Sequence, residues 1–266
     1  MTETMPAPSR TENLEPLITV DDLTMAYGSF VVQKDLTFTI NRRDIFVIMG
    51  GSGCGKSTLM YHLMGLRRPA AGTVIFGGRN VWESTAEERE AILRRTGMLY
   101  QAGALWTSMT LAENVSLPIE EYTDLKPSQV RALASLKLAL VGLAGYEDFY
   151  PSEISGGMMK RAGLARAMAL DPEILFFDEP SAGLDPISSK RLDDLILQLR
   201  DSLGSTIVIV THELPQIFAL ANNSIYLCNQ KRTITAKGDP KEILRTTTDP
   251  IVKEFLTRDG TFTNVA

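Results

Sequence analysis

Alternating apolar and polar residues near the start of the chain predict two strands of an antiparallel layer. Ile18 to Tyr27 alternate in this way, and Leu36–Ile40 does so again after a turn signal at Gly28. Such alternation is typical of strands with one face on the core. From Ile45 to Met49 the apolar residues run without interruption, and a glycine-rich turn then leads to a predicted helix at Lys56–Met64. This pattern indicates a strand buried on both faces that opens a parallel βα unit.

The rest of the pattern predicts alternating strands and helices around a helical insertion. We expect a strand at Gly72–Phe76, a helix at Thr85–Arg95, a strand at Gly97–Tyr100, a strand at Ile174–Phe177, a helix at Ile187–Leu203, a strand at Thr206–Val210 and a hairpin at Ser224–Lys237. Residues 111–169 have a mostly helical pattern, broken by Pro118, Pro127, Gly142 and Pro151. The fold class is therefore α/β, with a parallel-sheet core, an N-terminal antiparallel β layer and an inserted helical subdomain at about residues 103–170.

The two ends of the chain differ from its middle. Residues 1–15 are rich in Pro, Ser, Thr and Glu and lack the apolar block of a secretory signal, so we expect a disordered lead-in. One globular domain follows over residues 16–240, and residues 241–266 form a C-terminal extension, which could pack across a dimer or bind a small accessory protein. No run approaches the roughly 18 apolar residues of a transmembrane helix, so we expect the chain itself to be soluble.

Charge and cysteine content narrow the classes of partner. The net charge of −5 argues against a surface built to neutralise nucleic-acid phosphates, so we expect no nucleic acid as partner. Two cysteines are too few for a disulfide framework, and neither lies in a zinc-binding pattern, which fits a reducing cytosol.

The glycine-rich turn has the spacing GxxxxGK[ST] of a phosphate-binding loop, between a buried strand and a helix. The run is Gly50-Gly51-Ser52-Gly53-Cys54-Gly55-Lys56-Ser57-Thr58. Glycines let backbone N–H groups converge on phosphate, and the helix start adds the positive end of its dipole. We expect Lys56 to reach the β- and γ-phosphates of a nucleotide, Ser57 to bind Mg²⁺ and Thr58 to add a phosphate contact. The alternative is a glycine-rich turn that matches by chance.

Two adjacent carboxylates, Asp178 and Glu179, end the apolar strand at Ile174–Phe177. Ligands gather at the carboxyl ends of parallel strands, so we expect Asp178 in the Mg²⁺ shell and Glu179 orienting the attacking water. A solvent-facing acidic strand end is the alternative. A phosphate-binding loop with an acidic strand also occurs in kinases and GTPases, so a further motif must separate these classes.

That motif is the triplet Ser155-Gly156-Gly157 before a helix of apolar and basic residues. Ser155 suits a helix N-cap, and the glycines with their free amides could bind a second phosphate surface. An ordinary capped helix is the alternative. The triplet closely resembles the signature motif of ABC-family ATPase subunits, in which the loop of one subunit and the signature of a second copy sandwich each ATP. The resemblance covers Leu17 to Gly238 and implies an ABC ATPase domain at residues 16–240.

Several single residues match the family in order along the chain. Tyr27 matches the aromatic that stacks on adenine, and Gln101 matches the glutamine that senses Mg²⁺ and the membrane partner. Ser181–Asp185 resembles the segment that crosses the dimer interface, and His212 matches the histidine that contacts the γ-phosphate. One departure is Met158, where the family commonly has Gln. A Gln side chain can hydrogen-bond near the ribose or phosphates, and a thioether cannot do so comparably.

The segment Gln101–Thr110 and the Ser-Gly-Gly-Met sequence that ends at Met158 look most like the ATPase subunits of Mla-type phospholipid transporters. This similarity implies lipid traffic between membranes, with this chain bound peripherally at the cytoplasmic face of the inner membrane. It also implies a separate permease docking near Gln101–Thr110, around Leu105, Trp106 and Met109, and an MCE-domain lipid-binding protein. The alternatives are an ABC importer for another small substrate and a non-transport ABC ATPase.

Overall fold

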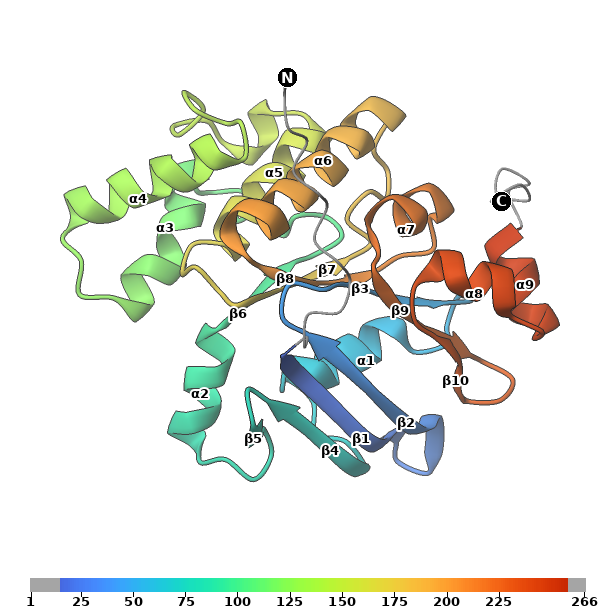
Figure 1. Ribbon diagram of the computed structural model, residues 1–266. Coiled ribbons are helices and arrows are strands. Elements are labelled where there is room, and N and C mark those ends of the chain that lie inside the picture. The colour runs from blue at the N-terminus through green and yellow to red at the C-terminus, as the bar shows by residue number, and fades with distance from the viewer. Residues whose placement is uncertain (1–14, 258–266) are drawn as a thin grey trace, which may run out of the picture.

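Two β-sheets form the frame of the computed structural model, which describes residues 15–257 (Figure 1). The antiparallel sheet contains β1 (Pro16–Tyr27), β2 (Phe30–Asn41), β4 (Ala71–Phe76) and β5 (Arg79–Asn80). The second sheet contains β3 (Ile45–Gly50), β6 (Thr96–Leu99), β7 (Ile174–Asp178), β8 (Thr206–Val210), β9 (Asn223–Cys228) and β10 (Thr233–Lys237). The orders are β2-β1-β4-β5 and β10-β9-β3-β8-β7-β6, and only the β9–β10 pair of the second sheet is antiparallel.

Successive side chains of the central parallel strands enter two different cores. Ile45, Val47 and Met49 of β3 join the core beneath the helices, whereas Phe46 and Ile48 join the core shared with the antiparallel sheet. All five are at most 1% exposed. A strand buried on both faces needs a continuous apolar run, which is what the sequence pattern predicted here.

Helices cover both the parallel sheet and its flanks. Their bounds are α1 Lys56–Leu63, α2 Ala86–Arg94, α3 Leu111–Tyr122, α4 Pro127–Leu140, the 3-10 helix η1 Pro151–Glu153, α5 Gly156–Ala167, α6 Pro186–Leu203, α7 Leu214–Leu220, α8 Pro240–Thr246 and α9 Pro250–Thr257. Helices α3, α4 and α5 pack on one another as a group to one side of the sheet (Figure 1). The mixed α/β fold with a parallel sheet, an antiparallel layer and a helical insertion is confirmed.

Two predictions about local structure were wrong. Strand β2 begins at Phe30 rather than Leu36, because it pairs with β1 along nearly its whole length up to the turn at Gly28. Pro118 does not break the helical segment but lies inside α3. It removes one backbone hydrogen bond, yet Val115 and Ile119 on either side are fully buried, and their packing keeps the helix intact.

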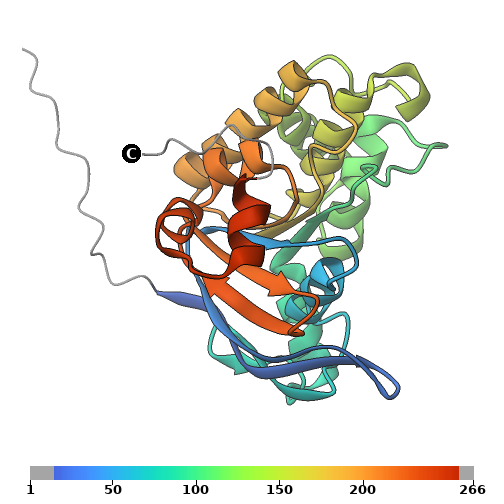
Figure 2. The ribbon, with the colours of Figure 1, turned by 90° about the vertical axis from the view of Figure 1, so that its right-hand side faces the viewer.

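The start of the C-terminal extension packs on the main core. Val252 and Leu256 of α9 are fully buried, and the ring of Phe255 meets Tyr226 of β9 edge-on at 5.1 Å between centroids. Figure 2 shows α8 and α9 beside β9 and β10. The predicted disordered lead-in falls outside the described residues except for Glu15. Between residues 15 and 257, no helix combines the length and the apolar character needed to cross a membrane.

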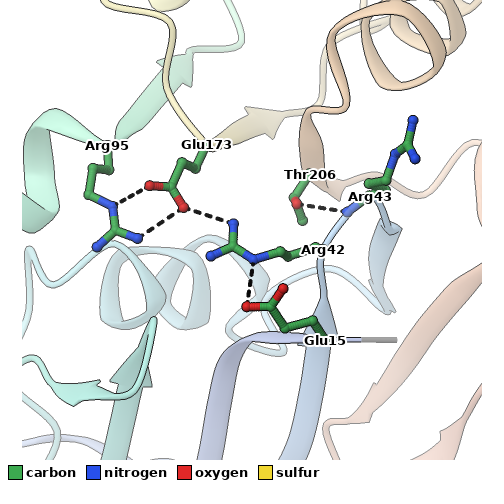
Figure 3. A network of polar contacts seen from close by, with 6 residues as sticks. All are labelled: Glu15, Arg42, Arg43, Arg95, Glu173 and Thr206. Carbon is green, nitrogen blue, oxygen red and sulfur yellow. Dashed lines mark hydrogen bonds and ion pairs between the residues drawn. The ribbon is translucent and has the colours of Figure 1, made fainter. Parts of the chain in front are cut away.

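An ion-pair network joins the two sheets at the amino ends of the parallel strands (Figure 3). Glu173, just before β7, accepts from Arg95 at 2.6 and 2.9 Å and from Arg42 at 2.9 Å. Arg42, just after β2, also pairs with Glu15 at 3.2 Å. The hydrogen bond from Arg95, followed by that from Arg42, lowers the pKa of the Glu173 carboxyl against the opposing effect of burial. This network ties the antiparallel layer to the sheet at the edge opposite the candidate site.

Candidate active site

The glycine-rich loop turns sharply between β3 and α1. Gly50, Gly53 and Gly55 have φ values of +148°, +72° and +98°, a region that favours glycine. A Cβ at Gly50 would lie 2.6 Å from both the Sγ of Cys54 and the carbonyl oxygen of Leu227. The loop therefore needs glycine at this position to lie against β9.

Lys56 and Ser57 begin α1 and face two different partners. The Nζ of Lys56 donates to the carbonyl oxygens of Gly50 and Gly51, both at 3.0 Å, which holds the ammonium over the loop. The Ser57 hydroxyl donates to Oδ1 of Asp178 at 3.1 Å. Burial raises the pKa of the Asp178 carboxyl, and the hydrogen bond from Ser57 opposes that rise. A hydroxyl beside a carboxylate is a pair of hard oxygen donors that fits Mg²⁺, whose charge would favour the ionised carboxylate.

Glu179 follows β7 in a strained conformation. Its φ is +48°, uncommon for a residue with a side chain, and its N–H donates to the carbonyl oxygen of Val210 at 2.8 Å. The Oε1 atom lies 2.8 Å from Nδ1 of His212, which follows β8. Among the described residues, Oε2 of Glu179 is buried without a hydrogen-bond partner. The contact with His212 thus holds one carboxylate oxygen at the carboxyl edge of adjacent strands, next to a strained backbone position.

The tip of the β1–β2 hairpin supplies an aromatic end to the site. Tyr27 and Phe30 are directly opposite each other across the turn and are 50% and 57% exposed. The Tyr27 hydroxyl is 3.5 Å from the Thr58 hydroxyl, and the Arg67 guanidinium lies 3.7 Å from the centre of the Tyr27 ring. A cleft of about 460 Å³ joins the hairpin to the loop; it is lined by Tyr27, Phe30, Val32, Ser52, Gly53, Gly55, Lys56, Ser57, Thr58, Glu179 and Val210.

Comparison with known families gives a match to the ABC transporter model over residues 33–182, which is more than half of the chain. The chain belongs to the ABC transporter family. The match spans both the glycine-rich loop and Glu179, whereas Tyr27, Phe30, Val32 and Val210 of the cleft lining lie outside it.

Relatives of this cassette carry two different functional names. A probable ribonucleotide transport ATP-binding protein, mkl, of Mycobacterium bovis is 41% identical over 90% of this chain, which spans 66% of that protein's length. The intermembrane phospholipid transport ATP-binding protein MlaF of Haemophilus influenzae is 38% identical, with 90% of each chain covered. MlaF of Escherichia coli K12 is 36% identical over 92% of this chain and 90% of its own. The resemblance to Mla-type ATP-binding proteins is therefore confirmed.

Solved structures confirm the fold of the cassette. The cbiO1 protein of Clostridium perfringens superposes with a TM-score of 0.80 at 23% identity, over 92% of this chain and 95% of that one. The ATP-binding cassette MJ0796, solved as a dimer bound to ADP and Pi, superposes with a TM-score of 0.75 at 26% identity, over 84% and 98%.

Some residues predicted for the cassette's site lie outside the cleft of the single chain. Gln101 is exposed on the turn after β6, the strand that pairs with β7. Ser155, Gly156 and Gly157 begin α5 in the helical group, and none of them lines the cleft. The cleft is thus lined by Glu179 and by six of the predicted loop residues, Ser52, Gly53, Gly55, Lys56, Ser57 and Thr58, but not by Gly50, Gly51, Cys54, Asp178, His212 or the predicted signature.

The signature itself has the predicted cap. Ser155 is the N-cap of α5, and its side chain accepts from the N–H of Met158 at 3.3 Å. A Cβ at Gly156 would meet nothing within 4 Å, and Ser155 and Gly156 are exposed, so this end of the helix is open to solvent. Met158 packs against the main core, which gives its apolar side chain a role where the family commonly has Gln.

Several residues that support the site gave no motif signal. Gln33 is fully buried, and its Nε2 donates to the carbonyl oxygens of Cys54 at 2.8 Å and Cys228 at 3.3 Å, bracing the loop from below. Cys54 itself is buried, so its thiol does not face the cleft. Phe30 could have been found from its place across the turn from Tyr27. Gln33 gave no such sign, because it stands beside the charged residues Lys34 and Asp35, before the predicted strand.

A second hollow lies beside the segment Gln101–Thr110. Trp106 is 61% exposed and lines a largely apolar groove of about 480 Å³ with residues of β6 and α3. Asn114 shapes the segment from beneath: its Oδ1 accepts from the Trp106 N–H at 2.7 Å, and its Nδ2 donates to the Trp106 and Thr110 carbonyl oxygens at 3.0 and 2.9 Å. These hydrogen bonds hold the backbone of the segment in place, and the Trp106 indole stays largely exposed.

Proposed function

We propose that this chain is the ATP-hydrolysing subunit of an ABC transporter that moves phospholipid between membranes. The observation that carries the proposal is the convergence of Lys56, the Ser57–Asp178 pair and the Glu179–His212 pair at one edge of adjacent strands. In the order β3-β8-β7 these groups follow neighbouring strands. Lys56, Ser57 and Glu179 line the cleft, and Asp178 and His212 contact Ser57 and Glu179, which supports one shared site.

The proposed reaction is phosphoryl transfer from ATP to water. Lys56 binds the β- and γ-phosphates, and Ser57 with Asp178 holds Mg²⁺, directly or through water. When bound, Mg²⁺ would supply positive charge to offset the negative charge on the phosphate oxygens. Glu179 orients the attacking water with the oxygen that faces no protein partner, while His212 keeps its other oxygen in place and contacts the γ-phosphate.

A complete site requires a second copy of the chain in this proposal. Ser155-Gly156-Gly157 lies outside the cleft of its own subunit, so its free amides are available to an ATP held by a partner. The MJ0796 cassette, which is dimeric when bound to ADP and Pi, supports a dimer of this chain. Tyr27 supplies the adenine face, and Gln101 would be a further residue that holds Mg²⁺.

The membrane partner is proposed to dock at the groove beside Trp106. Exposed aromatic residues in a groove suit an inserted helix from a permease subunit.

The other proposed components are an MCE-domain lipid-binding protein and a small accessory protein on the C-terminal extension. In this proposal the chain lies at the cytoplasmic face of the inner membrane. Phospholipid is favoured over ribonucleotide as cargo because the MlaF relatives match over 90% of both chains.

Glu179→Gln tests hydrolysis. The amide cannot accept a proton, so turnover should fall by about 10²–10⁴-fold while ATP still binds and the variant accumulates as an ATP-bound dimer. Phosphate release and size-exclusion chromatography with light scattering measure the two effects. Glu213→Gln, a carboxylate near the same edge that does not line the cleft, is the matched control. Normal hydrolysis by the Glu179 variant would remove the basis of the proposal.

Trp106→Ala tests the partner and cargo. The indole is mostly exposed, so the melting temperature should stay unchanged while the variant loses its membrane partners on co-purification. Mass spectrometry of the native complex identifies the cargo. Bound phospholipid together with an MCE protein supports the proposal, and a bound ribonucleotide cargo instead would overturn its substrate.

A further inference from the structure

A buried lysine on the signature helix reaches the loop that follows Glu179. Lys160 lies on α5, near the start marked by Ser155, and is only 6% exposed. Its Nζ donates to the carbonyl oxygens of Pro180 at 2.6 Å and Ala182 at 2.5 Å. The Lys160 ammonium therefore joins α5, the helix that begins with the signature, to the segment between β7 and α6. Helices α5 and α6 lie side by side (Figure 1).

The partners of this ammonium are backbone carbonyls. Between residues 15 and 257 no ion pair joins Lys160 to a carboxylate; Glu179 and Glu213 act on it only at longer range. Burial lowers the pKa of the Lys160 ammonium. A buried charge is costly unless its hydrogen bonds are well placed, and lysine offers three N–H donors on one atom. The Pro180 and Ala182 carbonyl oxygens thus share one donor atom, and a shift of the Lys160 Nζ would act on both.

The segment that Lys160 holds is a series of tight turns starting at the strained glutamate. Ala182 N–H donates to the Glu179 carbonyl oxygen at 3.2 Å, and Leu184 N–H donates to the Ser181 carbonyl oxygen at 3.0 Å. A residue with φ of +48° keeps that conformation only where its surroundings leave no alternative. The bonds from Lys160 act on the residues immediately after Glu179, so they help to fix its backbone.

We propose that Lys160 is a positioning residue that fixes the carboxylate of Glu179 by clamping the next three residues, and that it thereby links the signature end of α5 to the hydrolytic step. The inference rests on the proposed function. Movement of α5 at its signature end would shift the Lys160 nitrogen, and the carbonyls would move with it. A displacement of about 1 Å at such a site can lower a rate by about 100-fold.

Lys160→Met tests the clamp, because it keeps the length and apolar stem but removes the donors. Full-length wild type and variant are compared for kcat, KM for ATP and melting temperature. We expect kcat to fall about 10- to 100-fold while KM stays within about twofold, since Lys56 and Tyr27 are untouched. Lys160→Arg, which keeps a charged donor within reach of both carbonyls, should restore most of the rate.

Lys137→Met is the matched control. Lys137 is a second buried lysine, 3% exposed, on α4 in the same helical group, and it pairs with Asp171 away from the cleft. We expect it to lower the melting temperature but leave kcat unchanged. A Lys160→Met protein that is folded and keeps the wild-type kcat would overturn the inference, as would a raised KM at unchanged kcat.

Two further outcomes keep the test decisive. If Lys160→Met does not fold, Lys160→Gln takes its place, since it keeps a shorter neutral donor; it should also lower kcat, and a wild-type kcat would overturn the inference. Wild-type protein that hydrolyses no ATP would instead refute the proposed function. The two failures are thus distinguishable from the same assay.

Discussion

Glu173→Gln removes the charge at the centre of the ion-pair network between the two sheets. Glu173 accepts three hydrogen bonds from two guanidinium groups, and its side chain is 35% exposed. An exposed ion pair contributes about 0.2–1 kcal/mol, whereas a bond to a buried charge contributes about 1.5–3 kcal/mol. Glu173 forms two such ion pairs, with Arg95 and with Arg42, at intermediate exposure. After a discount for solvent screening, we expect the substitution to lower the free energy of unfolding by about 1–2 kcal/mol. For a chain of this size that lowers the melting temperature by about 2–8 °C.

The loss should depend on pH in a defined direction. Arg95 and then Arg42 lower the pKa of Glu173 in the folded protein. The network therefore makes its full contribution to the free energy of unfolding when the pH is above the pKa that Glu173 has in the unfolded chain. That contribution disappears as the pH falls through the lowered pKa of the folded state. Urea unfolding of wild type and variant from pH 7 down to about pH 3.5 should show their difference in unfolding free energy shrinking below about pH 4.3.

Glu90→Gln is the matched control for this experiment. Glu90 makes a single bond to Arg94 at 2.7 Å on an exposed helix face, with side chains 52% and 48% exposed. Its removal should cost about 0.3–0.5 kcal/mol. Two results would refute the reasoning that the network stabilises the contact between the two sheets. One is that Glu173→Gln lowers the free energy of unfolding no more than Glu90→Gln does, and the other is that its effect is the same at every pH.

Two other changes test local backbone arguments. Gly50→Ala places a Cβ 2.6 Å from Cys54 Sγ, so it should destabilise the fold by about 1–3 kcal/mol and abolish ATP binding; Gly51→Ala, whose Cβ meets nothing within 4 Å, should keep the wild-type melting temperature. Equal melting temperatures for the two variants would contradict the steric argument. Thr110→Ala removes the N-cap of α3 and should cost about 1 kcal/mol in thermal unfolding, an expectation that an unchanged transition would refute.

Features carried by neighbouring residues could be predicted from the sequence. The phosphate-binding loop, the acidic end of β7 and the N-cap at Ser155 each depend on a few consecutive residues, whose spacing determines backbone direction and hydrogen bonding. The apolar run at Ile45–Met49 likewise predicted a strand buried on both faces, because successive side chains of a strand point to opposite sides. Family resemblance added the roles of Tyr27 and His212.

Features that join distant parts of the chain came only from the tertiary structure. Gln33 braces a loop and a strand from 21 and 195 residues away, and Lys160 clamps carbonyls 20 and 22 residues away. In the sequence each stands next to another polar residue and looks like a surface position, since burial and partner depend on how separate elements pack. Pro118 was misjudged for the same reason: local propensity favours a break, but packing of the whole helix outweighs one lost hydrogen bond. Local chemistry therefore determined which groups the site contains, and packing decided how they are held.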